Sequence, residues 1–306
     1  MTDALETFGH PALFYRGDAE YLNGVVPFVL EGLDRGEAVA VAVPGRNLML
    51  VEKALENRAD EVRLIDMERA GRNPGGILPG VLYAFADAHP GPVRIVGEPI
   101  WADRTPEEYP ACVQHEALIN RAFAGRDLTV LCPYDSAELK PAVLADAERT
   151  HPELRDSFGS WPSPRYDPMA VLTDYNLPLP APAAAAEFRF DLTLLAAARG
   201  FAETWAARYG LRYPRRGDLV LAASELCTNS VLHAGGEGVL RLWREPAQIV
   251  LEVCDHGSLT DPLAGRVPAP SGRPGGRGLV LVNLLADLVR MHRALGGTRV
   301  RAFFRR

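Results

Sequence analysis

The sequence contains few cysteines, and they lie far apart. Only four occur among its 306 residues, and none belongs to a CxxC pair. This spacing argues against a zinc ribbon and against a small scaffold held together by disulfides. We therefore expect buried, reduced thiols at Cys112, Cys132, Cys227 and Cys254.

Long apolar runs and an excess of basic charge are also missing. No segment is apolar over the length needed to cross a bilayer, and residues 1–17, MTDALETFGHPALFYRG, carry acids where a secretory signal would carry cations. A cytoplasmic protein without a membrane partner is expected. The 33 basic and 39 acidic residues give a net charge of −6, so no direct nucleic-acid partner is expected either.

Apolar residues, in contrast, make up 47% of the chain, which is enough for two hydrophobic cores at this length. One segment interrupts the pattern. Residues 161–187 are rich in proline and alanine and have no amphipathic period, which is typical of an extended linker. We predict one domain over residues 1–160 and another over residues 188–306.

Strands and helices alternate in the first domain. Helices are expected at 21–36 and 46–58 and strands at 37–44 and 62–67, with further segments of both kinds as far as residue 135. This order predicts a parallel sheet that is covered by helices on both faces.

The second domain reads as an α/β sandwich. Strands are expected at 187–193, 238–245, 247–255 and 297–306, and helices at 194–210, around 222–233 and at 278–295. The Gly/Pro-rich stretch before residue 278 is the one long irregular segment, which is typical of a lid or an insert.

The helix around residues 222–233 carries three polar residues at four-residue intervals. Glu225, Asn229 and His233 form a ridge, because steps of four drift only about 40° around a helix. The amide oxygen of Asn229 suits Mg²⁺, which prefers oxygen ligands. Near a phosphate, Glu225 would act as a general base. A polar helix face with a satisfied carboxylate is the alternative.

Four motifs follow in order: ELCTNSVLH (225–233), LEVCDHG (251–257), GGRGLVLV (275–282) and GGT (296–298). Together they resemble the nucleotide-binding boxes of the GHKL ATPases, the class of gyrase, histidine kinases and anti-sigma serine kinases. The resemblance covers residues 188–306 and implies ATP and Mg²⁺ as cofactors. It also implies that Asp255 selects adenine and that the Thr298 hydroxyl supports this aspartate.

The glycines of these motifs have a physical reading of their own. Gly257 lets the backbone turn close to the base. Gly276 and Gly278 precede an apolar helix, so free N–H groups can face a polyphosphate. Three further candidate nucleotide contacts are basic. Arg273 and Arg277 would stabilise charge on the transferred phosphoryl group. His233 would contact phosphate or cap its own helix.

The chain departs from the family at Ser258, where a second glycine is usual, and this puts turnover in more doubt than binding. The compact size favours the anti-sigma kinase branch. The resemblance then implies two protein partners, a sigma factor and an anti-anti-sigma protein of the STAS type that is phosphorylated on Ser or Thr. A homodimer is compatible with it.

The first domain carries its own resemblance. Residues 10–44, with EALINRAFAGRDLTVLCPYD (116–135), are similar to the methanogen/methylotroph sensory (MEDS) domain, which implies a RecA-like parallel sheet. The turn VPGRNLML (43–50) lacks the lysine and hydroxyl of a phosphate loop, so we expect a sensor and no second ATPase. The candidate contacts for a small-molecule ligand are His10, Tyr15, Glu98, Cys132 and Tyr134, with core packing as the alternative for each.

His115 in VQHEALINR (113–121) has no second histidine at zinc-protease spacing, and we expect it at the surface. Three functions stay open: an anti-sigma regulator with serine/threonine kinase activity, a histidine-kinase-like ATPase of a two-component pathway, and a nucleotide-gated binding module without kinase activity.

Overall fold

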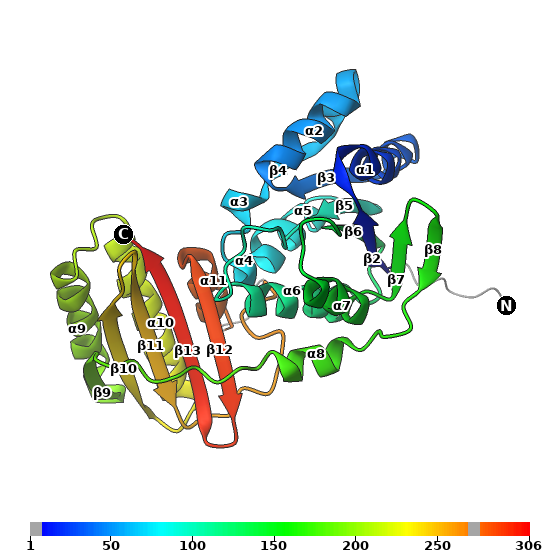
Figure 1. Ribbon diagram of the computed structural model, residues 1–306. Coiled ribbons are helices and arrows are strands. Elements are labelled where there is room, and N and C mark those ends of the chain that lie inside the picture. Colours follow the sequence, from blue (N-terminus) through cyan, green and yellow to red (C-terminus); the bar gives the residue numbers. More distant parts are fainter. Residues whose placement is uncertain (1–7, 269–275) are drawn as a thin grey trace. The chain divides into compact units, whose positions relative to one another are not determined.

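The computed structural model describes residues 8–268 and 276–306, and the chain forms two compact units, residues 1–175 and 176–306. Each unit has its own sheet (Figure 1). None of the helices in the described part of the chain is apolar over a length that could span a bilayer.

The first unit is built on an eight-stranded sheet of order β4-β3-β5-β6-β2-β7-β8, with β1 also paired to β6. All described pairs are parallel except the β7–β8 hairpin. The expected RecA-like parallel sheet is therefore observed. The strands are β1 (Phe8–Gly9), β2 (Pro11–Tyr15), β3 (Ala38–Val43), β4 (Arg63–Asp66), β5 (Val93–Gly97), β6 (Leu128–Asp135), β7 (Glu153–Asp156) and β8 (Gly159–Pro162).

Helices lie between the parallel strands, and one more follows β8. They are α1 (Gly17–Asp34), α2 (Gly45–Leu55), α3 (Met67–Ala70), α4 (Pro74–Ile77), α5 (Tyr83–Ala86), α6 (Tyr109–Ala122), α7 (Pro141–Thr150) and α8 (Pro168–Asp174), with shorter turns at Glu56–Glu61 and Leu78–Leu82. Helix α6 packs against α4, α7 and α8. His115 on α6 is consequently buried, with 1% of its surface exposed, and the expected surface position is wrong.

The second unit is an antiparallel sheet of order β12-β13-β11-β10-β9 with helices packed on one face. This confirms the expected GHKL-type α/β sandwich. Its strands are β9 (Ala186–Asp191), β10 (Glu237–Arg244), β11 (Gln248–Asp255), β12 (Leu288–Ala294) and β13 (Gly297–Arg305), and its helices are α9 (Leu195–Arg208), α10 (Arg215–His233) and α11 (Gly278–Leu285). Ala198, Ala202 and Ala206 repeat every four residues on α9 and are buried where it packs.

The single helix expected over residues 278–295 is wrong. Helix α11 ends at Leu285, and residues 288–294 form the edge strand β12, which pairs with β13 from Leu288 opposite Phe303 to Ala294 opposite Gly297. The chain changes from helix to strand at Asp287, whose buried carboxylate accepts a hydrogen bond from the backbone N–H of Arg305. Cross-strand pairing therefore overrides the local helical pattern.

The linker expected over residues 161–187 is not extended throughout. Asp167 caps α8 by accepting the Ala170 N–H, and Pro168 occupies the first turn, a position where proline favours a helix. The two units divide between Tyr175 and Asn176. Tyr175 accepts a hydrogen bond from Gln114 in the first unit through its carbonyl.

The rest of this segment lies on the second unit. The Asn176 side chain donates to the carbonyl of Arg293 and accepts its N–H. Arg299 and Arg301 donate to the carbonyls of Leu179 and Pro180, respectively. The stretch 176–180 is therefore part of the second unit's hydrogen-bond network.

Candidate functional site

The polar ridge of α10 points toward the start of α11. A Cβ atom built on Gly278 would lie 2.7 Å from Glu225 Oε2, 3.2 Å from Asn229 Nδ2 and 3.4 Å from Asn229 Oδ1. Both side chains are half-buried. The absence of a side chain at position 278 is therefore what allows the carboxylate and the amide to reach the helix terminus.

Asp255 stands at the end of β11 with both carboxylate oxygens held. Ser230 on α10 donates to Oδ2 at 2.6 Å, and the N–H of Gly257 donates to Oδ1 at 3.0 Å. Ser230 is buried and was not among the residues predicted from the sequence. These two bonds fix the carboxylate while leaving it acceptor capacity for a ligand.

Gly257 is required by a close approach. A Cβ atom there would lie 2.3 Å from the Cβ of Ala234, at the end of α10. The Thr298 hydroxyl donates to the Gly257 carbonyl at 2.9 Å. Thr298 supports the aspartate through the turn that carries Gly257.

A cavity of about 660 Å³ opens beside these residues. Apolar side chains, glycines and polar groups all line it. The lining includes the apolar Leu226, Val253, Leu263, Val267, Leu279 and Val300, the predicted residues Asn229, His233, Asp255, Gly257, Gly276, Gly278 and Thr298, and also Ser258. Glu225 lies outside this lining but next to Gly278, which belongs to it.

The start of α11 forms the anion-attracting part of the cavity. Gly276 has a φ of +77°, a conformation that favours glycine, and Gly278 opens an eight-residue helix. Their backbone supplies N–H groups and a positive helix end. Arg277 is exposed beside them, whereas Arg273 lies outside the described residues.

His233 is exposed and lines the cavity at the last residue of α10. The described part of the chain offers its imidazole no hydrogen bond. The phosphate contact and the capping of α10 both stay predictions for His233.

A first polar group in the other unit lies at the carboxyl end of the parallel strands, and it includes two of the predicted ligand contacts. Asn47 donates to both oxygens of Glu98, at 3.1 and 2.9 Å, and Tyr15 donates to Oε1 at 3.5 Å. Burial raises the pKa of Glu98 to about 8. The carboxyl group is therefore largely protonated at neutral pH.

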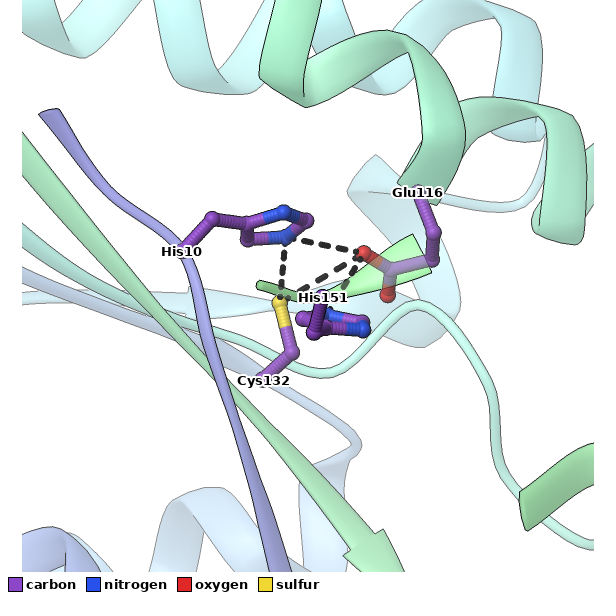
Figure 2. A group of neighbouring side chains, drawn as sticks. All are labelled: His10, Glu116, Cys132 and His151. Atoms are coloured by element: carbon purple, nitrogen blue, oxygen red, sulfur yellow. Dashed lines mark hydrogen bonds and ion pairs between the residues drawn. The ribbon is translucent and has the colours of Figure 1, made fainter. Parts of the chain in front are cut away.

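A second polar group contains the predicted His10, Cys132 and Tyr134. It also contains Glu116 from α6 and His151, which follows α7, and neither was predicted (Figure 2). Tyr134 donates to Glu116 Oε1 at 3.1 Å. Burial and then the nearby His151 lower the pKa of His10 to about 4. Sequence spacing could not reveal this group, because its members come from distant segments.

Comparisons with known proteins match the two parts of the chain to different domain families. The model of the MEthanogen/methylotroph, DcmR Sensory domain matches residues 9–152, and the model of the histidine kinase-like ATPase domain matches residues 188–304. The serine-protein kinase RsbW of Halalkalibacterium halodurans is 34% identical over 100 residues, which cover 28% of this chain and 60% of RsbW. The chain thus spans less than two thirds of this relative.

A solved structure of the RsbU and RsbW domains of Rv1364c from Mycobacterium tuberculosis is also similar. The match has 20% identity and a TM-score of 0.31, and covers 41% of this chain and 33% of that one. The two domain models confirm the resemblances noted in the sequence. Residues 9–152 thus match the MEDS sensory domain and residues 188–304 the histidine kinase-like ATPase domain.

Proposed function

We propose that the second unit binds ATP with Mg²⁺ in the cavity beside α10 and phosphorylates a serine or threonine of an anti-anti-sigma protein. We also propose that the chain sequesters a sigma factor and that the MEDS domain modulates this choice of partner. The observation that carries the proposal is the meeting of Glu225 and Asn229 at Gly278, the first residue of a helix that faces the cavity.

The residues that line the cavity favour one orientation of a bound nucleotide, with the base at Asp255 and the phosphates at the start of α11. Asp255 would accept the exocyclic amine of adenine, while Leu226, Val253 and Leu279 supply apolar surface to the base. The phosphates would then extend toward Gly276 and Gly278, where backbone N–H groups and the end of the helix dipole favour anions.

The donor set also suits Mg²⁺. Asn229 would provide an amide oxygen to the ion, which supplies charge neutralisation to the phosphates when bound. Glu225, one turn earlier, would accept the proton of the attacking hydroxyl. Arg277 and His233 would add positive charge around the transferred phosphoryl group.

The direct test is phosphate transfer from labelled ATP to a purified anti-anti-sigma protein from the same cell. We expect an acid-stable phosphoserine or phosphothreonine on that partner, and ATP binding in the micromolar range or weaker. The readouts are separable, because calorimetry reports binding even where transfer fails.

A nucleotide-gated binding module is the second candidate, and one observation favours it. Ser258, where the related family usually has glycine, is exposed and lines the cavity. Tight ATP binding without transfer to any bound partner would select this candidate. Burial of His115 speaks against the two-component alternative, because a phosphoacceptor histidine must be accessible.

A further inference from the structure

A buried cluster in the first unit combines four side chains that are typical metal ligands. His10 Nε2, Glu116 Oε2, Cys132 Sγ and His151 Nε2 all lie within 4.8 Å of one another, and all four residues are buried. Their ligand atoms point toward one another from separate elements (Figure 2). The cluster plays no part in the proposed kinase reaction.

Hydrogen bonds at the outer nitrogen of each imidazole fix its tautomer, so that the inner nitrogen can bind a metal ion. Asn120 donates its amide to backbone carbonyls, including that of Thr150 at 2.8 Å, so its oxygen faces His10 Nδ1 at 3.1 Å. The Nδ1 of His151 faces the Ala147 carbonyl at 2.9 Å. A carbonyl can only accept, so each Nδ1 carries the proton and each Nε2 presents a lone pair to the cluster.

Neither imidazole therefore brings a positive charge to the atoms that face one another inside the cluster. Two imidazole lone pairs and an oxygen of Glu116 converge, and His151 Nε2 has no hydrogen-bond partner in the described part of the chain. Converging buried acceptors are costly unless a cation joins them.

Four of the six separations between the ligand atoms fit a tetrahedral ion. Bond lengths of about 2.0–2.3 Å to zinc place neighbouring ligand atoms roughly 3.3–3.7 Å apart. Glu116 Oε2 lies 3.2 Å from His10 Nε2 and 3.5 Å from His151 Nε2, and Cys132 Sγ lies 3.4 Å from His10 Nε2 and 3.5 Å from Glu116 Oε2.

We propose that His10, Glu116, Cys132 and His151 bind one divalent transition metal of the zinc class in the sensory domain. The Cys132 S–H bond breaks, its proton passes to solvent, and a sulfur–metal bond forms. One thiolate, one carboxylate and two neutral imidazoles then balance the two positive charges, so the buried centre is neutral. Tyr134 and Asn120 orient Glu116 and His10 as outer partners.

The test loads the full chain, stripped of metal under reducing conditions, with Zn²⁺ or Co²⁺. We expect one equivalent to bind per chain, to raise the unfolding temperature, and to give a thiolate-to-cobalt charge-transfer band. The variants Cys132→Ser and His151→Gln should lose the metal at least about 100-fold more readily in competition with a chelator. Cys112→Ser removes another buried thiol of the same unit and is the matched control.

The cobalt spectrum of the wild-type chain tests the proposal without any variant, because the thiolate-to-cobalt band reports directly whether a cysteine binds the metal. A folded wild-type chain that takes up no Zn²⁺ or Co²⁺, also when refolded with the metal, overturns the proposal. So does a metal complex without the thiolate band, or one that Cys132→Ser retains unchanged.

Discussion

The Ser230 hydroxyl donates a 2.6 Å hydrogen bond to Oδ2 of Asp255, joining α10 to the end of β11. The same helix carries Glu225 and Asn229 toward Gly278. A single rigid element therefore positions both the proposed adenine acceptor and the proposed phosphate-end residues. The geometry of the site depends on how α10 packs on the sheet.

Asp255→Asn should weaken ATP binding about 10- to 100-fold, because a charge-assisted hydrogen bond to the base is lost. Ser230→Ala should weaken ATP binding less, by about 2- to 10-fold, because the Asp255 carboxylate stays in place and loses only the hydrogen bond that orients it. Calorimetry with ATP and GTP measures both the loss and the change in selectivity. Equal affinities in the wild type and Asp255→Asn would remove the adenine role.

Glu225→Gln should retain most ATP binding and lose phosphoryl transfer by about 10²- to 10⁴-fold, since a general base is removed. Asn229→Ala should impair both Mg-dependent binding and transfer. Sigma-factor binding should survive Glu225→Gln. Transfer at the wild-type rate by this variant would show that another group takes the proton.

Gly278→Ala should displace the Glu225 carboxylate, which lies 2.7 Å from the added Cβ. The carboxylate ends a flexible side chain, so we expect little loss of stability but a clear loss of transfer. Gly217→Ala on α10 is the matched control, because its added Cβ meets no atom within 4 Å. If the two variants transfer phosphate equally well, the contact has no role in positioning.

The contribution of Glu98 to the stability of the first unit should fall as the pH rises from about 4.5 to about 8, whereas the lowered pKa of His10 acts in the opposite direction between about 4 and 6.5. Glu98 has a folded-state pKa of about 8, whereas its ordinary value is 4.5. Across this window the folded chain keeps a proton that the unfolded chain has released, which costs up to about 1.4 kcal/mol per pH unit. Glu98→Gln has no such proton. Urea unfolding curves of the two proteins should therefore diverge toward pH 8, and a constant difference would contradict the assignment.

A fragment of residues 176–306 should be more stable than one of residues 188–306. The shorter fragment loses the Asn176 bonds to Arg293 and the carbonyls that accept from Arg299 and Arg301. Each such bond contributes about 0.5–1.5 kcal/mol net. Urea midpoints with and without ATP give the comparison, and coincident midpoints would show that residues 176–180 stabilise nothing.

The sequence predicts what depends on local spacing. The four-residue steps of Glu225, Asn229 and His233 indicated the ridge, and the apolar strand before Asp255 indicated where that carboxylate would emerge. Ser230 adjoins the ridge, but its bond to Asp255 arises only when helix and sheet pack together. The sequence-based prediction therefore missed it.

Longer-range pairing explains the other differences. Residues 288–294 have a helical pattern but lie beside β13, and the pairing decides their conformation. The cluster of His10, Glu116, Cys132 and His151 has no spacing signal at all, because parallel strands and two helices bring its members together from distant positions. Only the fold reveals it.

The bond between residues 175 and 176 is where the chain passes from the first unit to the second. Tyr175 is held by Gln114 in one hydrogen-bond network, and the next residue, Asn176, is held by Arg293 in the other. Each unit therefore completes its own hydrogen bonds on its own side of the bond between residues 175 and 176, so a cut there would leave both networks whole.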